Sequence, residues 1–145
     1  MSSYTLHRTL VLSLQQGTDL YDGITRILSD HSVQLGRITG VGAVRNAAIV
    51  CYDTSTGKYE EITLDQPMEV TTLGGNVRTS QGKPIAHIHV MLSDAQGHTR
   101  GGRLLPGRSS VVSCEIIVEE FHETTGVRES DPAAALRRSP VPETL

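Results

Sequence analysis

The chain has 145 residues, of which 37% are hydrophobic and 20% charged, and its formal net charge is −3. These values predict one globular domain and exclude the strongly basic balance by which many proteins hold nucleic acid through counterion release. The apolar runs are shorter than the about 20 residues that cross a bilayer, and the first residues lack a signal pattern, so we expect a cytoplasmic protein with no membrane contact.

Residues 4–14 alternate as a strand does, with Leu6, Leu10 and Leu12 on one side. The next segment, 17–33, repeats its apolar residues at helical spacing, and Thr18 is placed to cap the start of the helix. This is the one amphipathic helix that the sequence predicts, so its apolar stripe should pack on a sheet.

From residue 35 onward, short strand-like runs alternate with turn signals. The expected strands are 34–44, 45–53, 58–64, 68–77, 84–92, 98–105 and 111–121, with a further one at 126–130. This pattern predicts an α+β fold, a single domain with a mostly antiparallel sheet of about seven or eight strands and one main helix packed on it. We expect the domain to occupy residues 1–130 and a tail rich in proline and alanine to occupy 131–145.

The most informative stretch is PIAHIHVML, residues 84–92. Because alternate residues of a strand share a face, its even-numbered apolar residues should belong to the core and His87 and His89 to the opposite face. The two imidazoles would then lie about 6 to 7 Å apart along the strand. They could converge on one small ion or group.

A turn at residues 94–97 leads the chain back toward Gly101 and Gly102. A four-residue loop would place Gly102 opposite His89 and turn Arg103 to the other face of the sheet, but a bulge at the two glycines would return Arg103 to the histidines. His98 would share the face of His89 at a distance of about 13 Å by strand rise, too far to complete a metal shell.

Three interpretations of the histidine pair follow. A dedicated metal site needs a third protein ligand, which His87 and His89 do not supply. An arginine beside two imidazoles instead forms a cradle for a carboxylate or a phosphate. In the third interpretation the histidines form a polar strand face that water and neighbouring backbone satisfy. Spacing alone leaves all three open.

Other chemistry is sparse. The sequence has no Ser/His/Asp nucleophile arrangement, phosphate loop or dinucleotide fingerprint. Glu69, flanked by Met68 and Val70, is the carboxylate that we expect to point inward. Cys51 and Cys114 lie in strand-like apolar sequence without metal-type spacing, so we expect free, buried thiols.

Several motifs, taken in order, resemble the PPC domain (plants and prokaryotes conserved), in its stand-alone prokaryotic form without an AT-hook. They are GVGAVRNAAIVCYD with KYEE, MEVTTLGGNV, AHIHVMLSDAQGHTRGGRLLPG and CEIIVEEF, and they span about residues 5 to 128. The resemblance implies a compact α+β fold that assembles as a homotrimer. Family members often carry the label of DNA-binding proteins, but the AT-hook that reads the minor groove in plant members is missing here, so we do not expect direct DNA binding.

Prokaryotic members of the family commonly carry His-x-His and a later Gly-Gly-His, which together resemble a three-histidine metal site. His87 and His89 match the first pair, but the third position is Arg103, which removes one ligand and adds a positive charge. The family pattern therefore supports the bulge that would bring Arg103 to the histidines. A Phe-Glu-Ile-Leu stretch, associated with partner contact in plant members, appears here as residues 68–71, with Glu69 kept.

The first hypothesis is a trimeric protein of regulatory or scaffolding type in which His87, His89 and Arg103, with Glu69 as a further candidate, bind a small anion. Its alternatives are a zinc-binding protein that uses His87 and His89 as ligands, a DNA-associated regulator that works through partner proteins, and an enzyme with one of the histidines as general base. The lack of a nucleophile or cofactor motif favours a role without catalysis. No cofactor is expected, with zinc as the alternative.

Overall fold

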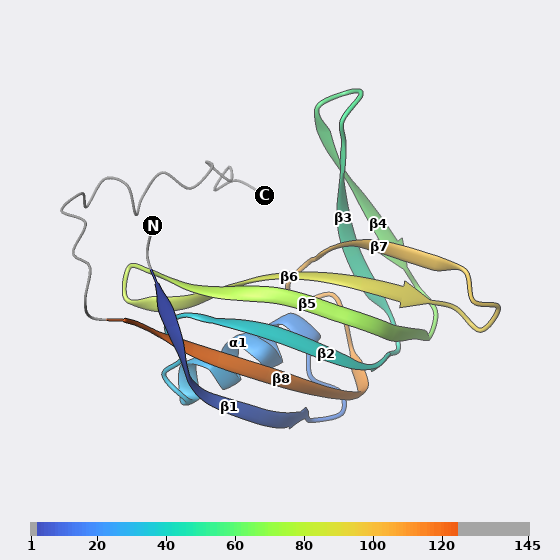
Figure 1. Cartoon of the computed structure of the whole chain (residues 1–145). Helices are drawn as coiled ribbons and strands as arrows, with labels where there is room; N and C mark the ends of the chain where they lie inside the picture. Colours follow the sequence, from blue (N-terminus) through green and yellow to red (C-terminus); the bar gives the residue numbers. More distant parts are fainter. Residues whose placement is uncertain (1–2, 125–145) are drawn as a thin grey trace.

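The computed structural model describes residues 3–124, which form one sheet with one helix across one of its faces (Figure 1). In chain order the elements are β1 (Tyr4–Leu14), α1 (Leu20–Asp30), β2 (Gly36–Val44), β3 (Ala47–Asp53), β4 (Lys58–Leu64), β5 (Met68–Ser80), β6 (Lys83–Ser93), β7 (Thr99–Leu104) and β8 (Val111–Glu123). The predicted α+β fold is confirmed. The expected strand at 126–130 and the expected tail at 131–145 lie outside the described residues.

The eight strands lie in the order β1-β8-β2-β5-β6-β7-β3-β4. All of the pairings are antiparallel. The hairpin of β3 and β4 extends away from the rest of the sheet at one edge (Figure 1). No helix among residues 3–124 is long and apolar enough to cross a membrane.

The core lies between α1 and the face of the sheet that the helix covers. Leu20, Ile24 and Leu28 of α1 are fully buried, as the helical spacing predicted. In β6 the even-numbered residues from Ala86 to Leu92 are at most 2% exposed, so they belong to the core. Full burial of each large aliphatic side chain stabilises the fold by about 1.5 to 3 kcal/mol.

The helix begins one residue later than the sequence suggested, because Asp19 and not Thr18 is its N-cap. One carboxylate oxygen of Asp19 accepts a hydrogen bond from the backbone N of Asp22 at 2.9 Å, and the other accepts from the backbone N of Ser109 at 2.8 Å. The hydroxyl of Thr18 donates to the carbonyl of Gln15 instead. A contact with the segment before β8 thus decides which residue caps the helix.

Strand β1 also departs from its expected pattern. Leu10 and Leu12 pack against the core, but Leu6 is 55% exposed. The cause is a shift in the register of β1 against β8 between Leu6 and Arg8, which puts an extra residue, His7, into β1. Because a one-residue shift moves a side chain to the other face, the predicted grouping of the three leucines was wrong.

Candidate anion-binding site on the open face of the sheet

The face of the sheet that is turned away from α1, called the open face below, carries the histidine pair. His87 is half-buried and His89 is exposed, while Ile88 between them is buried in the core. Strand β5 lies along one side of β6, with Asn76 opposite His87 and Gly74 opposite His89. The prediction that both histidines face away from the core is confirmed.

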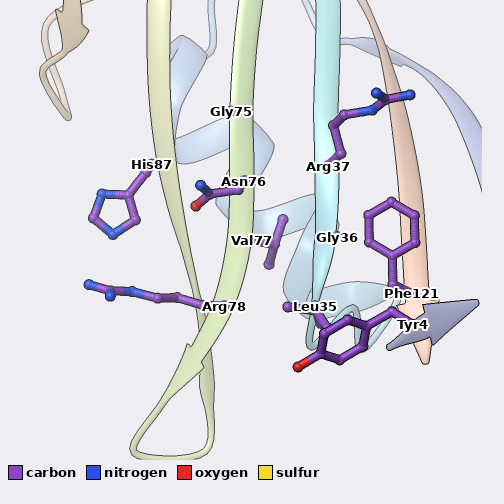
Figure 2. A pocket seen from close by; sticks show the side chains of 10 residues that line it. All are labelled: Tyr4, Leu35, Gly36, Arg37, Gly75, Asn76, Val77, Arg78, His87 and Phe121. Atoms are coloured by element: carbon purple, nitrogen blue, oxygen red, sulfur yellow. The ribbon is translucent and has the colours of Figure 1, made fainter. Parts of the chain in front are cut away.

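A hollow of about 700 Å³ lies on the open face beside His87 (Figure 2). Its polar lining comes from Arg37 of β2, Asn76 and Arg78 of β5 and His87 of β6, and Figure 2 shows the His87 ring and the Arg78 guanidinium next to one another. Apolar side chains, which include the rings of Tyr4 and Phe121, line the rest of it. The hollow therefore joins cationic and aromatic groups.

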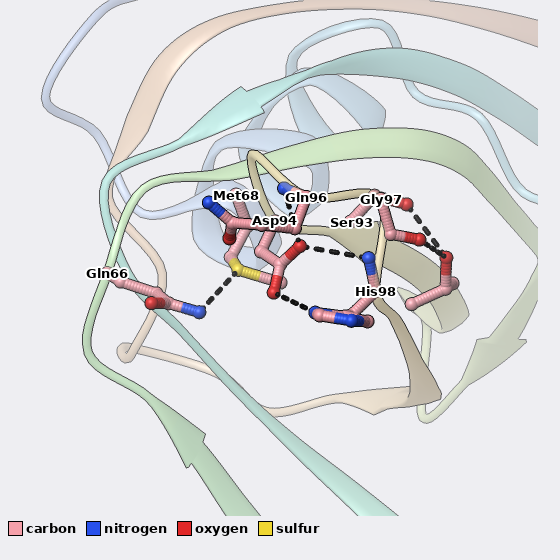
Figure 3. Close-up of polar contacts among 8 residues, drawn as sticks. Gln66, Met68, Ser93, Asp94, Gln96, Gly97 and His98 are labelled. Atoms are coloured by element: carbon pink, nitrogen blue, oxygen red, sulfur yellow. Dashed lines mark hydrogen bonds and ion pairs between the residues drawn. The ribbon is translucent and has the colours of Figure 1, made fainter.

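The loop between β6 and β7 sets the position of Arg103. Asp94 closes this loop, because one of its carboxylate oxygens accepts hydrogen bonds from the backbone N of Gln96 and of His98, both at 2.9 Å (Figure 3). Gly97 adopts a φ of 84°, a left-handed conformation that favours glycine. Ser93 consequently pairs with Thr99, so the loop has five residues and not the four that the sequence suggested.

The extra loop residue moves β7 by one position against β6. Arg103 now lies directly opposite His89, and Gly102 lies opposite Val90. The β6–β7 register shows no shift, so the predicted bulge at the two glycines was wrong although Arg103 does reach the histidine face. Directly opposed residues have Cβ atoms about 4.5 to 5.5 Å apart, so the guanidinium and the imidazole can share one small ligand.

The electrostatics around His87 favour an anion. Burial lowers the pKa of the His87 imidazole, and the positive charges of Arg78 and Arg103 and the neighbouring His89 lower that pKa further. The Nε2 of His87 and the Nε of Arg78 are both buried and have no hydrogen-bond partner among the described residues. A negatively charged group would supply both the charge and the acceptors that these donors lack.

The charges of Arg78 and Arg103 are not balanced locally. Neither forms an ion pair with a carboxylate in residues 3–124, whereas Arg37 pairs with Glu119 and Arg108 pairs with Glu61. Two guanidinium groups that act on the same imidazole and lack a carboxylate partner are costly at half-buried positions. Such an arrangement is more stable when an anionic ligand binds.

The remaining predicted residues lie elsewhere. Glu69 is exposed and sits opposite Ser93, about 13 Å from His89 by strand rise, so its expected inward orientation was wrong. The two apolar neighbours of Glu69 take the core face, which leaves the open face to Glu69 itself. His98 holds the carboxylate of Asp94 at 3.1 Å, and its side chain is 80% exposed.

A zinc ion of the family type does not fit the histidine pair. Within the part of the chain that the structure describes, no third histidine, cysteine or carboxylate lies within ligand distance of His87 and His89. The third position holds Arg103, which stays protonated and repels a cation. The hydrogen-bond donors at this position suit an anion better than a cation.

Asn76 and Arg78 were missed in the sequence. Their signal was present, because both flank Val77 at the spacing that puts two residues on one face of a strand. The pairing of β5 with β6 places them beside His87. The alternation within each strand does not specify this register, so the sequence did not connect the two residues with His87.

The family model of the Plants and Prokaryotes Conserved (PCC) domain matches residues 1–122. The chain therefore belongs to this family, which is the one that its motifs resemble.

Solved structures show the same fold. The metal-containing protein AF0104 from Archaeoglobus fulgidus is 31% identical, with a TM-score of 0.77 over 91% of this chain and 92% of that chain. A plant- and prokaryote-conserved protein from Pyrococcus horikoshii is 25% identical, with a TM-score of 0.77 over 88% of this chain and 91% of that one. A structure from Bacteroides thetaiotaomicron with a provisional DNA-binding label shares the fold at 21% identity, with a TM-score of 0.72 over 83% and 84% of the two chains.

Two curated relatives are much longer proteins. The bifunctional protein GlmU from Synechococcus sp. strain JA-3-3Ab is 29% identical over 127 residues, which is 87% of this chain. GlmU from strain JA-2-3B'a(2-13) is 29% identical over 123 residues, or 84% of this chain. The chain spans about a fifth of the length of these relatives, since the matches cover 19% and 18% of them.

Proposed function

We propose that this PCC-domain protein has a regulatory or scaffolding role in the cytoplasm and binds a small carboxylate or phosphate anion on the open face of its sheet. His87, His89 and Arg103 would hold the anion, and Asn76 and Arg78 would add contacts from β5. The observation that carries the proposal is the direct pairing of Arg103 with His89, beside a His87 imidazole whose buried Nε2 lacks a partner among the described residues.

The chemistry of these groups suits a compact anion with several oxygens. A guanidinium donates two parallel hydrogen bonds to a carboxylate or a phosphate, and a protonated imidazole donates one charge-assisted bond. Arg78 belongs to β5 and lies opposite Ile85, whereas Arg103 belongs to β7 and lies opposite His89, so the two residues are offset by about 13 Å along β6 with His87 midway between them. An anion at His87 could therefore be contacted by long arginine side chains from both sides of β6.

Titration of the full chain with inorganic phosphate, and separately with acetate, at low salt tests the proposal. We expect the imidazole NMR signals of His87 and His89 to shift with a saturable dependence on anion concentration. Arg103→Gln should weaken this binding at least about tenfold, because hydrogen bonds to charged groups contribute about 1.5 to 3 kcal/mol. Arg100→Gln is the matched control, since it removes the same charge from β7 on the face opposite to the histidines.

The outcome of these titrations decides the proposal. If neither anion shifts the His87 and His89 signals, or if Arg100→Gln weakens binding as much as Arg103→Gln, the open face does not hold a specific anion site. If the NMR shifts disappear at moderate salt to the same extent in Arg103→Gln and Arg100→Gln, the anion is attracted only by the general positive charge of the surface, which salt screens.

We also propose that the chain assembles as a homotrimer, as the family resemblance implies. Exposed apolar side chains on the open face support self-association: Val11 is 71% exposed, Val41 56% and Ile117 42%, and Val11 lies opposite Ile117. Light scattering after size-exclusion chromatography should give three times the chain mass of 15.7 kDa. Ile117→Asp should lower that mass to one chain, and a wild-type protein of one-chain mass would contradict the proposal.

The alternatives to an anion-binding protein receive less support. Metal binding at the histidine pair, prompted by the metal-containing protein AF0104, lacks a third ligand here. Direct DNA binding receives no support from a chain with a net charge of −3. The presence of a related domain in the longer GlmU proteins agrees with a binding module rather than a self-contained enzyme.

A further inference from the structure

A second group of possible ligands lies at the corner of the sheet where the start of β1 pairs with the end of β8. His7, Glu120 and His122 place one ring nitrogen or carboxylate oxygen each within 4.8 Å of one another. No other group of three histidine, cysteine or carboxylate ligands occurs in residues 3–124. This corner cluster shares no residue with the anion site on the open face.

The register of β1 and β8 builds the corner cluster. Thr5 pairs with His122 and Arg8 pairs with Glu120, and the register shifts between Leu6 and Arg8. His7 is thus the extra residue of a bulge, which removes it from the regular alternation of β1. Its ring stacks on that of His122, with the two centroids 3.8 Å apart and an interplanar angle of 14°.

Glu120 is the unusual member of the cluster, because it is only 4% exposed and sits on the core side of β8. A buried carboxylate is costly unless charged groups and hydrogen bonds compensate for its lost hydration. Arg8 compensates in part, since its Nε donates to Oε2 of Glu120 at 2.5 Å. The Nη2 of Arg8 donates to the carbonyl of His31 at the end of α1, also at 2.5 Å, so the guanidinium is held from two sides.

These contacts fix the carboxylate and leave one of its oxygens available. Among the described residues, the hydrogen bonds to Glu120 engage only Oε2. Outer hydrogen bonds of this kind orient metal-binding carboxylates in proteins. Oε1 of Glu120 can therefore face the two imidazoles while Arg8 retains Oε2.

We propose that His7, Glu120 and His122 form a binding site for one divalent transition-metal ion of the zinc type. Two imidazoles and one carboxylate are a donor set that zinc uses where a fourth position stays open to water. Zinc bonds of about 2.0 to 2.2 Å place tetrahedral ligand atoms roughly 3.3 to 3.6 Å apart, whereas the three ligand atoms here lie within 4.8 Å of one another. Binding therefore requires the two stacked rings to rotate out of their near-parallel arrangement, so that their in-plane nitrogen lone pairs meet at the ion. Both histidines are exposed, which gives the ion a path of entry.

Titration with Co²⁺, whose visible spectrum reports its coordination, tests the proposal. The experiment uses the full chain with His87→Gln and His89→Gln, so that the histidine pair of the open face cannot contribute. We expect one Co²⁺ per chain, intense visible bands of a four- or five-coordinate ion, and displacement by one equivalent of Zn²⁺. His7→Gln and His122→Gln should each weaken Co²⁺ binding more than about tenfold. Substitution of residues that only hydrogen-bond a metal ligand already lowers metal affinity by about tenfold or more.

His31→Gln is the matched control, because His31 contacts Arg8, the partner of Glu120, through its backbone carbonyl and not through its ring. It should bind Co²⁺ as tightly as the parent protein, which is the full chain with His87→Gln and His89→Gln. Absence of stoichiometric Co²⁺ uptake by the parent would overturn the proposal, and so would uptake that His7→Gln and His122→Gln leave unchanged. Both substituted histidines are exposed, so the test does not depend on the folding of a Glu120 variant.

Discussion

Arg103 lies directly opposite His89 across β6 and β7, and the five-residue loop that Asp94 closes is the reason. Side chains alternate between the two faces of a strand, so a loop one residue shorter would have turned Arg103 to the other face. The charge of the histidine site is thus decided by a turn that contributes no ligand to it.

Arg103→His should convert the open face into a zinc site, because the register places the new imidazole opposite His89 and beside His87. Elemental analysis of the protein after zinc loading and dialysis measures this. The variant is made in a His122→Gln background, which keeps the corner cluster from adding metal. We expect about one zinc per chain in the variant and much less in the background.

Arg100→His is the control for that gain, because residue 100 lies opposite the buried Leu92 on the other face of the same strand. It should acquire no zinc. Equal zinc in the two histidine variants, or none in Arg103→His, would show that residue 103 does not share a site with the histidine pair.

The stability of the protein should depend on the protonation of His87. Its pKa in the folded state lies below the usual value of 6.5, so the unfolded chain binds more protons and stability rises with pH up to about that value. The free energy of unfolding, measured with urea between pH 5 and 8, should therefore decrease as the pH falls below 6.5. His87→Gln should flatten this part of the profile.

The same imidazole should report on bound anion. Saturating phosphate favours the protonated ring, so it should raise the pKa of His87 that NMR titration measures. Arg78→Gln should also raise this pKa, because it removes a positive charge that opposes protonation. A His87 pKa that neither phosphate nor Arg78→Gln changes would contradict the proposed grouping of these residues.

Gly75→Ala should destabilise the fold, because an added Cβ would lie 2.4 Å from the carbonyl oxygen of His87, a backbone atom. Overpacking of this kind costs about 1 to 3 kcal/mol. Urea unfolding should show a lower midpoint with an unchanged slope. The neighbouring Gly74→Ala is the control, since its Cβ would meet nothing within 4 Å. Equal effects at the two positions would contradict the close approach of β5 and β6 at Gly75.

Asp19→Ala should destabilise the protein by about 1 to 2 kcal/mol, because it removes the N-cap of α1. Any further loss comes from the unpaired backbone N of Ser109. Thr18→Ala should cost less, since the Thr18 hydroxyl contacts only the exposed turn before the helix. Thermal or urea unfolding of the two variants compares them. A larger loss of stability in Thr18→Ala than in Asp19→Ala would indicate that Thr18 is the N-cap, as the sequence suggested.

The sequence by itself determined the class of fold and the face of the histidine pair. Alternation places His87 and His89 away from the core, and the apolar spacing of Leu20, Ile24 and Leu28 produces a helix that must cover a sheet. Both are local properties, since the periods of strand and helix depend only on neighbouring residues. The ordered motifs also identified the family that the comparison with known proteins confirms.

Only the tertiary structure decided which residues meet. The loop after β6 sets Arg103 opposite His89, and the pairing of β5 with β6 brings Asn76 and Arg78 to His87. The bulge in β1 gathers the corner cluster around Glu120. Register depends on loop length and on contacts between distant segments, and a change of one residue moves every following side chain to the other face. Both proposed sites depend on such registers, which local periodicity does not specify.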